Sequence, residues 1–376
     1  MFSKLLALTL SAFCLASGVA LAETKAEADP KAGSKAKTLF PLAILPASVK
    51  MEPGAPEPVP GAFTIAILPD TQYYAQTYPD IFHKQTQWLA DQAAKYQIKF
   101  VIQVGDVTET AAEAEWTVAQ AAFKRLEGKV PWASAPGNHD YGGKLQIHSR
   151  RSPFSLAFPL ASFQAMPTFG GVYDKQPDKT ENQWHHFEAG GRKWLIIGLE
   201  YAPRVDVLRW AGDVAAAHLD HSVIIFTHAY LDPRTNERIK LQPGKPKAQA
   251  ANDSSSPPAE KPDLTQGEDL WRQVANKSPN VVMVLSGHAS YTNHRASVAA
   301  AGQTVQEMVV DYQRDVNGGN GWLRLLQILP DGETVRCQDY SPHIDQRCLM
   351  PDRTFDFEMA LPKASATATP APGLGR

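Results

Sequence analysis

Residues 137–140 have the sequence Gly-Asn-His-Asp and directly follow a short apolar run that ends at Ala135-Pro136. Further short polar motifs also stand where an apolar run ends, namely Asp70, Gly105-Asp106, His228 and Gly287-His288. Short apolar runs between turn signals predict buried β-strands. In open α/β sheets, ligands bind beyond the carboxyl ends of the strands. The five motifs therefore predict an α/β sheet whose strand ends converge on one polar site.

Strands and helices alternate along most of the chain. Strands are predicted at 63–68, 99–104, 131–135, 184–188, 194–200, 222–227 and 281–285, and helices at 79–96, 112–126, 205–219 and 267–276. From residue 303 onward the pattern is mainly β, at 321–329, 334–340 and 354–361. An α/β half followed by a β-rich half predicts two sheets packed face to face with helices outside.

The termini and one internal segment differ in composition from the rest of the chain. Residues 1–22 are typical of a secretory signal peptide, with Lys4, an apolar stretch and the cleavage site Ala20-Leu21-Ala22. Residues 23–60 are predicted to be a flexible Ala/Pro-rich linker, and 363–376 a flexible tail. One domain is expected over 61–362. Residues 233–262 form an insertion in it, which is either a functional lid or disordered.

Charge and cysteine content bear on the binding partners and the cellular compartment of the protein. Removal of Lys4 from the 37 basic residues leaves 36 against 39 acidic ones, a net charge of −3. That balance argues against a broad electrostatic footprint for nucleic acid or an anionic membrane. The mature chain is expected to be periplasmic or extracellular, without a transmembrane segment. In such an oxidising compartment Cys337 and Cys348 are predicted to form a disulfide.

The five motifs carry ligand types that divalent cations prefer, namely carboxylate, amide oxygen and imidazole. Two such ions about 3.5–4 Å apart can clamp a phosphoryl group and lower the pKa of a bridging water. Each motif alone is weak, because a Gly-Asp pair is usually a turn and a single histidine can be a core residue. Their joint placement, each after a predicted strand, carries the metal-site hypothesis.

In this order the motifs resemble those of the calcineurin-like metallophosphoesterases. The family pattern is Asp-x-His, Gly-Asp, Gly-Asn-His-Asp or -Glu, a lone His, and Gly-His-x-His. The chain has Asp70-Thr71-Gln72, Gly105-Asp106, Gly137-Asn138-His139-Asp140, Thr227-His228 and Gly287-His288-Ala289-Ser290. It is most similar to an exported bacterial or fungal branch whose first motif ends in Gln. Further likeness lies at Pro69–Tyr74, Leu199–Tyr201, Asp311–Gln313 and Asn317–Trp322.

The resemblance implies a four-layer αββα sandwich that hydrolyses phosphomonoesters or phosphodiesters with a water bridging two divalent metal ions. By position, six residues would bind metal: Asp106 both ions, Asp70 and Gln72 the first, and Asn138, His228 and His288 the second. His139 would be a general acid or transition-state donor, oriented by Asp140. Oxygen and imidazole ligands allow manganese, iron or zinc.

Two departures from the family pattern concern the first metal. Gln72 and Ser290 stand where the pattern has histidines, so we expect a firmly held second ion and a looser first one. His294, four residues beyond Ser290, is a further candidate ligand. Arg204 and Arg295 could steer an anionic substrate, although solvated surface arginine is an equal alternative.

The same departures leave two other function classes open. One is an exported metal- or phosphate-binding module with a degenerate first metal site and little turnover. The other is a surface or adhesion protein in which the insertion matters. Asp106 and the Asn138-His139 pair are intact, which favours the enzyme.

Overall fold

The computed structural model describes residues 50–142, 150–240 and 263–359. The predicted signal peptide, most of the linker, most of the insertion and the C-terminal tail lie outside these ranges. Within the described ranges, no helix combines the length and the apolar character that crossing a membrane would require.

The first sheet joins strands from both ends of the described chain. Its order is β1-β16-β15-β14-β2-β3-β4, with β17 also paired to β15. The bounds are β1 Met51–Pro53, β2 Phe63–Leu68, β3 Ile98–Gln103, β4 Trp132–Ser134, β14 Leu323–Ile328, β15 Thr334–Ser341, β16 Gln346–Cys348 and β17 Thr354–Glu358. Strands β2, β3 and β4 are parallel to one another, whereas β14 runs antiparallel to β2. The sheet is therefore mixed.

The second sheet comes from the middle of the chain, in the order β12-β13-β11-β8-β7-β6-β5. The bounds are β5 Phe169–Val172, β6 Gln183–Ala189, β7 Arg192–Leu199, β8 His221–Thr227, β11 Val281–Ser286, β12 Asn293–Val298 and β13 Thr304–Val309. Strands β7, β8, β11 and β13 are parallel, and the outer strands are antiparallel to their neighbours. A small hairpin, β9 Leu231–Asp232 with β10 Glu237–Arg238, completes the strands described.

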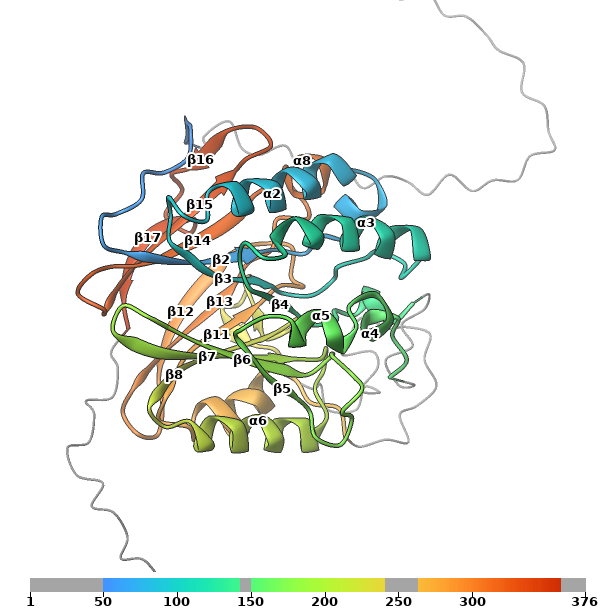
Figure 1. Ribbon diagram of the computed structural model, residues 1–376. Coiled ribbons are helices and arrows are strands. Elements are labelled where there is room, and N and C mark those ends of the chain that lie inside the picture. The colour runs from blue at the N-terminus through green and yellow to red at the C-terminus, as the bar shows by residue number, and fades with distance from the viewer. Residues whose placement is uncertain (1–49, 143–149, 241–262, 360–376) are drawn as a thin grey trace, which may run out of the picture. The chain divides into compact units, whose positions relative to one another are not determined.

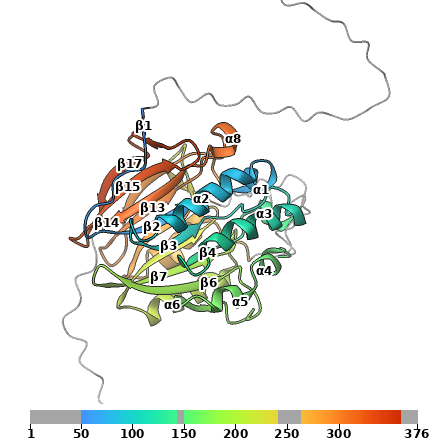
Figure 2. The ribbon, with the colours of Figure 1, turned by 45° about the horizontal axis from the view of Figure 1, so that its top comes forward.

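Helices cover the outer face of each sheet (Figures 1 and 2). The first sheet carries α1 Gln72–Gln76, α2 Pro79–Asp91, α3 Glu113–Phe123 with the short η1 Lys124–Leu126, α4 Phe154–Ala157 and α5 Leu160–Gln164. The second carries α6 Val205–Ala217 and α7 Gly267–Leu270, which continues as the π-helical turn η5 Trp271–Ala275. Two short elements, η2 His139–Tyr141 and α8 Val316–Gly319, follow β4 and β13. The predicted four-layer arrangement is confirmed.

Strand β2 shows why its sequence suits this arrangement. Phe63, Ile65 and Ile67 lie in the core between the two sheets, whereas Ala66 and Leu68 face the helices. Successive side chains of a strand point to opposite faces, and a strand covered on both sides is apolar throughout. All six residues of β2 are buried. The buried strand therefore fixes the position of Asp70, which follows two residues after its end.

The predicted linker extends too far toward the domain. Met51–Pro53 forms β1 and pairs with β16, the Tyr96 hydroxyl donates to the carbonyl of Pro56, and the Val59 N–H donates to the Gln327 side chain. Residues 51–60 therefore belong to the domain. The prediction is wrong there because backbone hydrogen bonds, to which Pro-rich composition gives no clue, hold the segment. The insertion likewise begins with ordered chain, since β10 lies inside 233–262.

The predicted disulfide is absent, since Cys337 and Cys348 are both buried free thiols. The strand register explains this: Cys348 lies opposite Asp339, and Cys337 lies opposite Phe355. The two cysteines are therefore diagonal neighbours across β15 and β16. Diagonal positions are about 7–8 Å apart, beyond the usual Cα separation of a disulfide. Both thiols pack in the core between the sheets instead.

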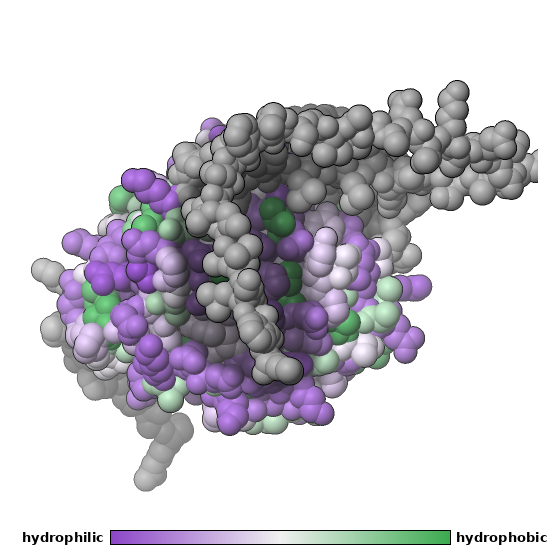
Figure 3. Space-filling model, turned by 90° about the horizontal axis from the view of Figure 1, so that it is seen from above, coloured by the Kyte–Doolittle hydropathy of each residue, from purple (hydrophilic) through white to green (hydrophobic). Residues whose placement is uncertain are grey.

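The surface seen from above in Figure 3 is mostly hydrophilic where described residues are visible, with apolar residues scattered singly. Scattered apolar residues are normal on a protein surface.

Candidate metal centre

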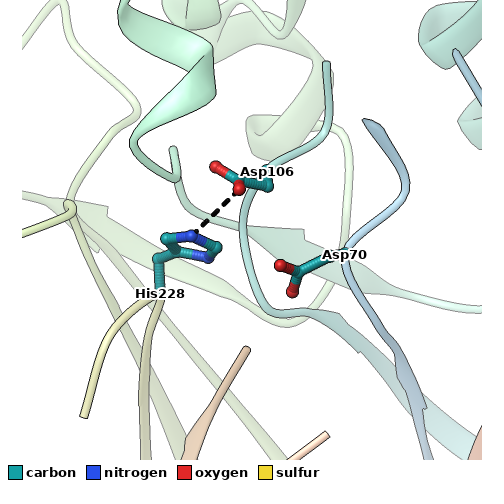
Figure 4. Close-up of side chains that lie close together, drawn as sticks. All are labelled: Asp70, Asp106 and His228. Atoms are coloured by element: carbon teal, nitrogen blue, oxygen red, sulfur yellow. Dashed lines mark ion pairs between the residues drawn. The ribbon is translucent and has the colours of Figure 1, made fainter. Parts of the chain in front are cut away.

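Three predicted ligands on three different loops converge in the structure. Asp70 follows β2, Asp106 follows β3 and His228 follows β8, and one ligand atom of each lies within 4.8 Å of the others. The three side chains point toward a common space (Figure 4). All are at most 2 % exposed. Burying a polar or charged group costs free energy unless the group has a partner. The loops bring three such groups together, and one cation bound between them could be the partner of all three.

Two glycines make this close approach possible. A Cβ atom on Gly137 would lie 2.2 Å from Asp106 Oδ1, and one on Gly287 would lie 2.0 Å from Asp70 Oδ1. Any larger residue would push the carboxylates out of place. The glycines of the third and fifth motifs therefore have a steric function, which the sequence pattern alone does not reveal.

Asn138, His228 and His288, here called the imidazole half-site, surround one side of Asp106. Asn138 Oδ1 lies 2.9 Å from His228 Nε2 and 2.8 Å from His288 Nδ1, and Asp106 Oδ2 lies 3.2 Å from His228 Nε2. The two imidazole nitrogens are 3.1 Å apart. Carboxylate and amide oxygens only accept hydrogen bonds. These two oxygens and the two imidazole nitrogens that face them form a ligand set for a cation.

His228 is oriented by the backbone. Its Nδ1 lies 3.1 Å from the carbonyl oxygen of Val104, which can only accept a hydrogen bond. In the neutral ring, the form that binds a metal, Nδ1 therefore carries the proton and Nε2 is the nitrogen that faces Asp106 and Asn138. A backbone carbonyl that fixes the tautomer in this way is common for metal-binding histidines.

Asp70 and Gln72, here called the oxygen half-site, lie on the other side of Asp106. The Gln72 Nε2 donates to Asp106 Oδ2 at 3.2 Å, while its Oε1 is buried without a hydrogen-bond partner. An unpaired buried amide oxygen is uncommon and destabilising. Because the Gln72 amide contacts the shared carboxylate Asp106, this unpaired oxygen is available as a metal ligand.

Two residues near the oxygen half-site carried no predicted metal role. Gln313 Nε2 donates to Asp311 Oδ2 at 2.8 Å and to Asp70 Oδ2 at 3.4 Å, and Gln313 Oε1 accepts from Gln72 at 2.9 Å. Asp311 is fully buried. The sequence does contain a signal for it, because Asp311 stands two residues beyond β13, as Asp70 stands two residues beyond β2.

The buried charges perturb one another strongly. Burial, together with the charges of Asp311 and Asp106, raises the pKa of Asp70 well above its usual value. Burial also opposes ionisation of Asp106, but His228 and His139 outweigh it and lower the pKa of that carboxyl. Burial and the neighbouring His228 lower the pKa of His288 to about 3, so that its ring is neutral and able to bind a cation. The centre holds more carboxylates than its side chains neutralise.

His139 lies beside the half-sites, and its ring contacts Glu109. Its backbone N–H donates to Asp106 Oδ1 at 2.9 Å, and its Nδ1 lies 2.8 Å from the carbonyl oxygen and 3.2 Å from the carboxylate of Glu109. Burial acts against the charged ring, but Asp106 and Glu109 raise the pKa of His139 to about 9. The ring is therefore a protonated donor at neutral pH.

The predicted role of Asp140 in orienting His139 is wrong. The Asp140 carboxylate accepts hydrogen bonds from the backbone N–H groups of Val107, Thr108 and Gly137 at 2.8–3.0 Å. Burial and the charge of Asp106 raise its pKa to about 6. Asp140 thus ties the second motif loop to the third, and Glu109, which no motif marks, contacts the His139 ring instead.

Arg204, Arg295 and His294 contact other parts of the protein. Arg204 pairs with Glu200 at 2.8 Å, and Arg295 donates to the carbonyl of Asn236 at 2.7 Å. Their role in substrate binding stays a prediction. His294 stacks on Phe355 with ring centroids 4.8 Å apart, and its Nε2 lies 2.7 Å from Gln306. It therefore does not replace the histidine missing at Ser290.

The residues present fit the two-cation centre that the sequence predicts. The acceptor-rich imidazole half-site, the unpaired Gln72 oxygen and the shared Asp106 supply ligands on both sides of one carboxylate. Such a set, built on loops at one edge of a four-layer sandwich, has the ligands needed to hold two divalent cations.

The calcineurin-like phosphoesterase family model matches residues 63–316, about two thirds of the chain, and the chain belongs to this family. It is 27 % identical over 300 residues to the uncharacterized protein YvnB of Bacillus subtilis. This match covers 77 % of the chain but only 21 % of YvnB.

Solved structures similar to the chain include a dimetal phosphatase from Danio rerio, which is 12 % identical in sequence and has a TM-score of 0.44. The match covers 79 % of this chain and 98 % of the Danio rerio chain. A purple acid phosphatase from yellow lupin seeds is 13 % identical and has a TM-score of 0.45. That match covers 80 % of this chain and 55 % of the lupin chain.

Proposed function

We propose that this protein hydrolyses phosphomonoesters or phosphodiesters at a centre that binds two divalent cations. The observation that carries the proposal is the convergence of the two half-sites on Asp106, whose Oδ2 lies 3.2 Å from both Gln72 Nε2 and His228 Nε2. When bound, two cations would activate a water as nucleophile and neutralise phosphate charge. No serine or cysteine nucleophile is required.

The chain's own residues would do the remaining work. Asp106 and the two half-sites hold the ligand atoms at fixed positions, so that little reorganisation accompanies binding. His139 would donate a proton from its ring to the leaving oxygen of the ester, with the contact between Nδ1 and Glu109 leaving Nε2 as the donor. A positioned general acid contributes about 10²–10⁴ in rate.

Paired variants test the proposal. In Asp106→Asn, the shared carboxylate is lost, and we expect metal content and activity to disappear together. In His139→Ala, metal content should remain while turnover falls at least about a hundredfold. Elemental analysis of the purified protein, combined with chromogenic mono- and diester substrates, measures both properties. Asp331→Asn, in an exposed turn between β14 and β15, is a control that should change neither.

The same measurements separate the enzyme from the alternative, a binding module with little turnover. Wild-type protein that carries metal but hydrolyses neither substrate class would favour the binding module. Activity that survives in Asp106→Asn would refute the proposed centre.

We further propose that the protein is exported, on the basis of the signal-like residues 1–22. Mass spectrometry of the protein purified from its native host should find a mature chain that begins at Glu23. An intact chain that still begins at Met1 would contradict export by this route.

A further inference from the structure

The oxygen half-site has fewer ligands than a hard cation needs. Asp70, Gln72 and the shared Asp106 supply three side chains, whereas Mg²⁺ and Ca²⁺ surround themselves with six or more oxygens. The imidazole that could have completed the set is missing at Ser290, and His294 lies elsewhere. A further ligand in reach of Asp70 would therefore decide whether this half-site holds an ion.

Asp311 is placed to be that ligand. The side-chain NH2 group of Gln313 joins the two carboxylates, with its Nε2 2.8 Å from Asp311 Oδ2 and 3.4 Å from Asp70 Oδ2. The backbone N–H of Ser290 also donates to Asp311 Oδ2, so the carboxylate stands next to the position of the missing histidine. One neutral donor therefore occupies the space between two buried carboxylates.

The charges around Asp311 are not balanced by the protein. Asp70 and Asp311 are 1 % and 0 % exposed, and among the residues that the structure describes neither forms an ion pair with lysine or arginine. The hydrogen bonds that these carboxylates accept come from uncharged amide groups. A buried carboxylate that lacks an ion-pair partner is costly to ionise unless it coordinates a metal. Gln72 Oε1, buried and unpaired in the same group, is a second and independent sign of a missing cation.

We propose that Asp311 binds the cation held by Asp70, which makes the oxygen half-site an all-oxygen site selective for a hard divalent cation. This inference rests on the proposed two-cation centre. Carboxylate and carbonyl ligands suit Mg²⁺ and Mn²⁺, whereas imidazole suits zinc and iron. The two half-sites would then select different metals, Mn²⁺ or Mg²⁺ beside Asp70 and Asp311, and Zn²⁺ or Fe²⁺ at the imidazole half-site.

Metal binding by the full-length protein tests this without relying on activity. Chelator-treated protein is titrated with Mn²⁺ alone, and bound metal is counted by equilibrium dialysis and elemental analysis. We expect two equivalents for wild type. Asp311→Asn should keep one equivalent and bind the other at least about tenfold more weakly, since even an indirect partner of a metal contributes 10–100-fold.

Matched variants make the result specific. Asp315→Asn removes a carboxylate from the same segment, where it pairs with Arg353 at 3.0 Å, and should leave both equivalents unchanged. His228→Ala should lose the equivalent that Asp311→Asn keeps. Circular dichroism of the metal-free proteins checks that each variant is folded.

A measurement on wild type alone covers the case in which Asp311→Asn does not fold. Protein exposed to Mn²⁺ and Zn²⁺ together should retain one of each, and retention of two zinc ions would overturn the selectivity. Two equivalents bound by Asp311→Asn with wild-type affinity would overturn the role of Asp311 alone. Wild type that binds no metal would overturn the two-cation centre as well.

Discussion

His185 makes the stability of the protein sensitive to acid. Its ring is fully buried on β6, packed edge-on against Phe100 at 5.2 Å, with Nε2 2.9 Å from Gln183 and Nδ1 3.2 Å from Thr168. Burial and the nearby His186 lower its pKa from the ordinary 6.5 to about 3. The folded protein therefore keeps this ring neutral at pH values where the unfolded chain protonates it.

The sign and size of the effect follow from this difference. Between pH 6.5 and about 3 the unfolded state binds more protons than the folded state, so the free energy of unfolding falls as the pH falls. At pH 5 the loss for one such histidine is RT ln(1 + 10^1.5), about 2 kcal/mol. Below about pH 3 the folded state also binds the proton and the loss stops growing.

Urea unfolding of wild type and His185→Gln between pH 8 and pH 5 measures this contribution. The variant starts from a lower stability, because it loses ring contacts, but its stability should fall by about 2 kcal/mol less over the same pH range. His186→Gln changes the next residue, whose side chain is exposed, and should keep most of the wild-type pH dependence. Parallel curves for wild type and His185→Gln would refute the reasoning.

Two further predictions concern the core. Asp339→Asn leaves the fully buried guanidinium of Arg324 without its bidentate partner, so the free energy of unfolding in urea should fall by about 3–5 kcal/mol. Asp356→Asn is the control, because it breaks an exposed pair with Arg336 and should change the free energy of unfolding by less than about 1 kcal/mol. Burial raises the pKa of the Cys337 thiol to about 12, and Cys348 is buried as well. Both cysteines should therefore react with a thiol reagent only after the protein is unfolded, and no reductant should be needed. If the unfolded protein reacts only after a reductant is added, the two cysteines form a disulfide.

The strands that carry the motifs could be predicted because their sequences are locally complete. The apolar run 63–68 corresponds to β2, and the predicted strands 184–188 and 194–200 correspond to β6 and β7. Sheet membership could not be predicted in the same way. The first sheet pairs β2 with β14, more than 250 residues later, and no local pattern records such a partner. The α/β half and the β-rich half therefore do not correspond to the two sheets.

The candidate site divides along the same line. Residues inside a motif, such as Asp70, Asp106 and His228, were predicted and come together. Glu109 and Asp311 were missed as site residues because their significance depends on contacts with loops far away in sequence. The sequence does contain a signal for Asp311, because it stands two residues beyond a strand, as Asp70 does. No such signal marks Glu109, which lies in an irregular segment after the second motif.

Hydrogen bonds join the motif loops to one another. The Asp106 carboxylate accepts the His139 N–H, the Asp70 carboxylate accepts the His288 N–H at 3.1 Å, and Asp140 accepts N–H groups from the two loops beside it. Asp106 and His288 have φ values of 50° and 76°, a conformation that destabilises a non-glycine residue by about 1–3 kcal/mol. The chain thus bears strain and carboxylate repulsion at one place, while the two-sheet core stabilises the fold. A cation bound at the centre would offset the repulsion between carboxylates that these hydrogen bonds already hold together, which is the property expected of a preorganised binding site.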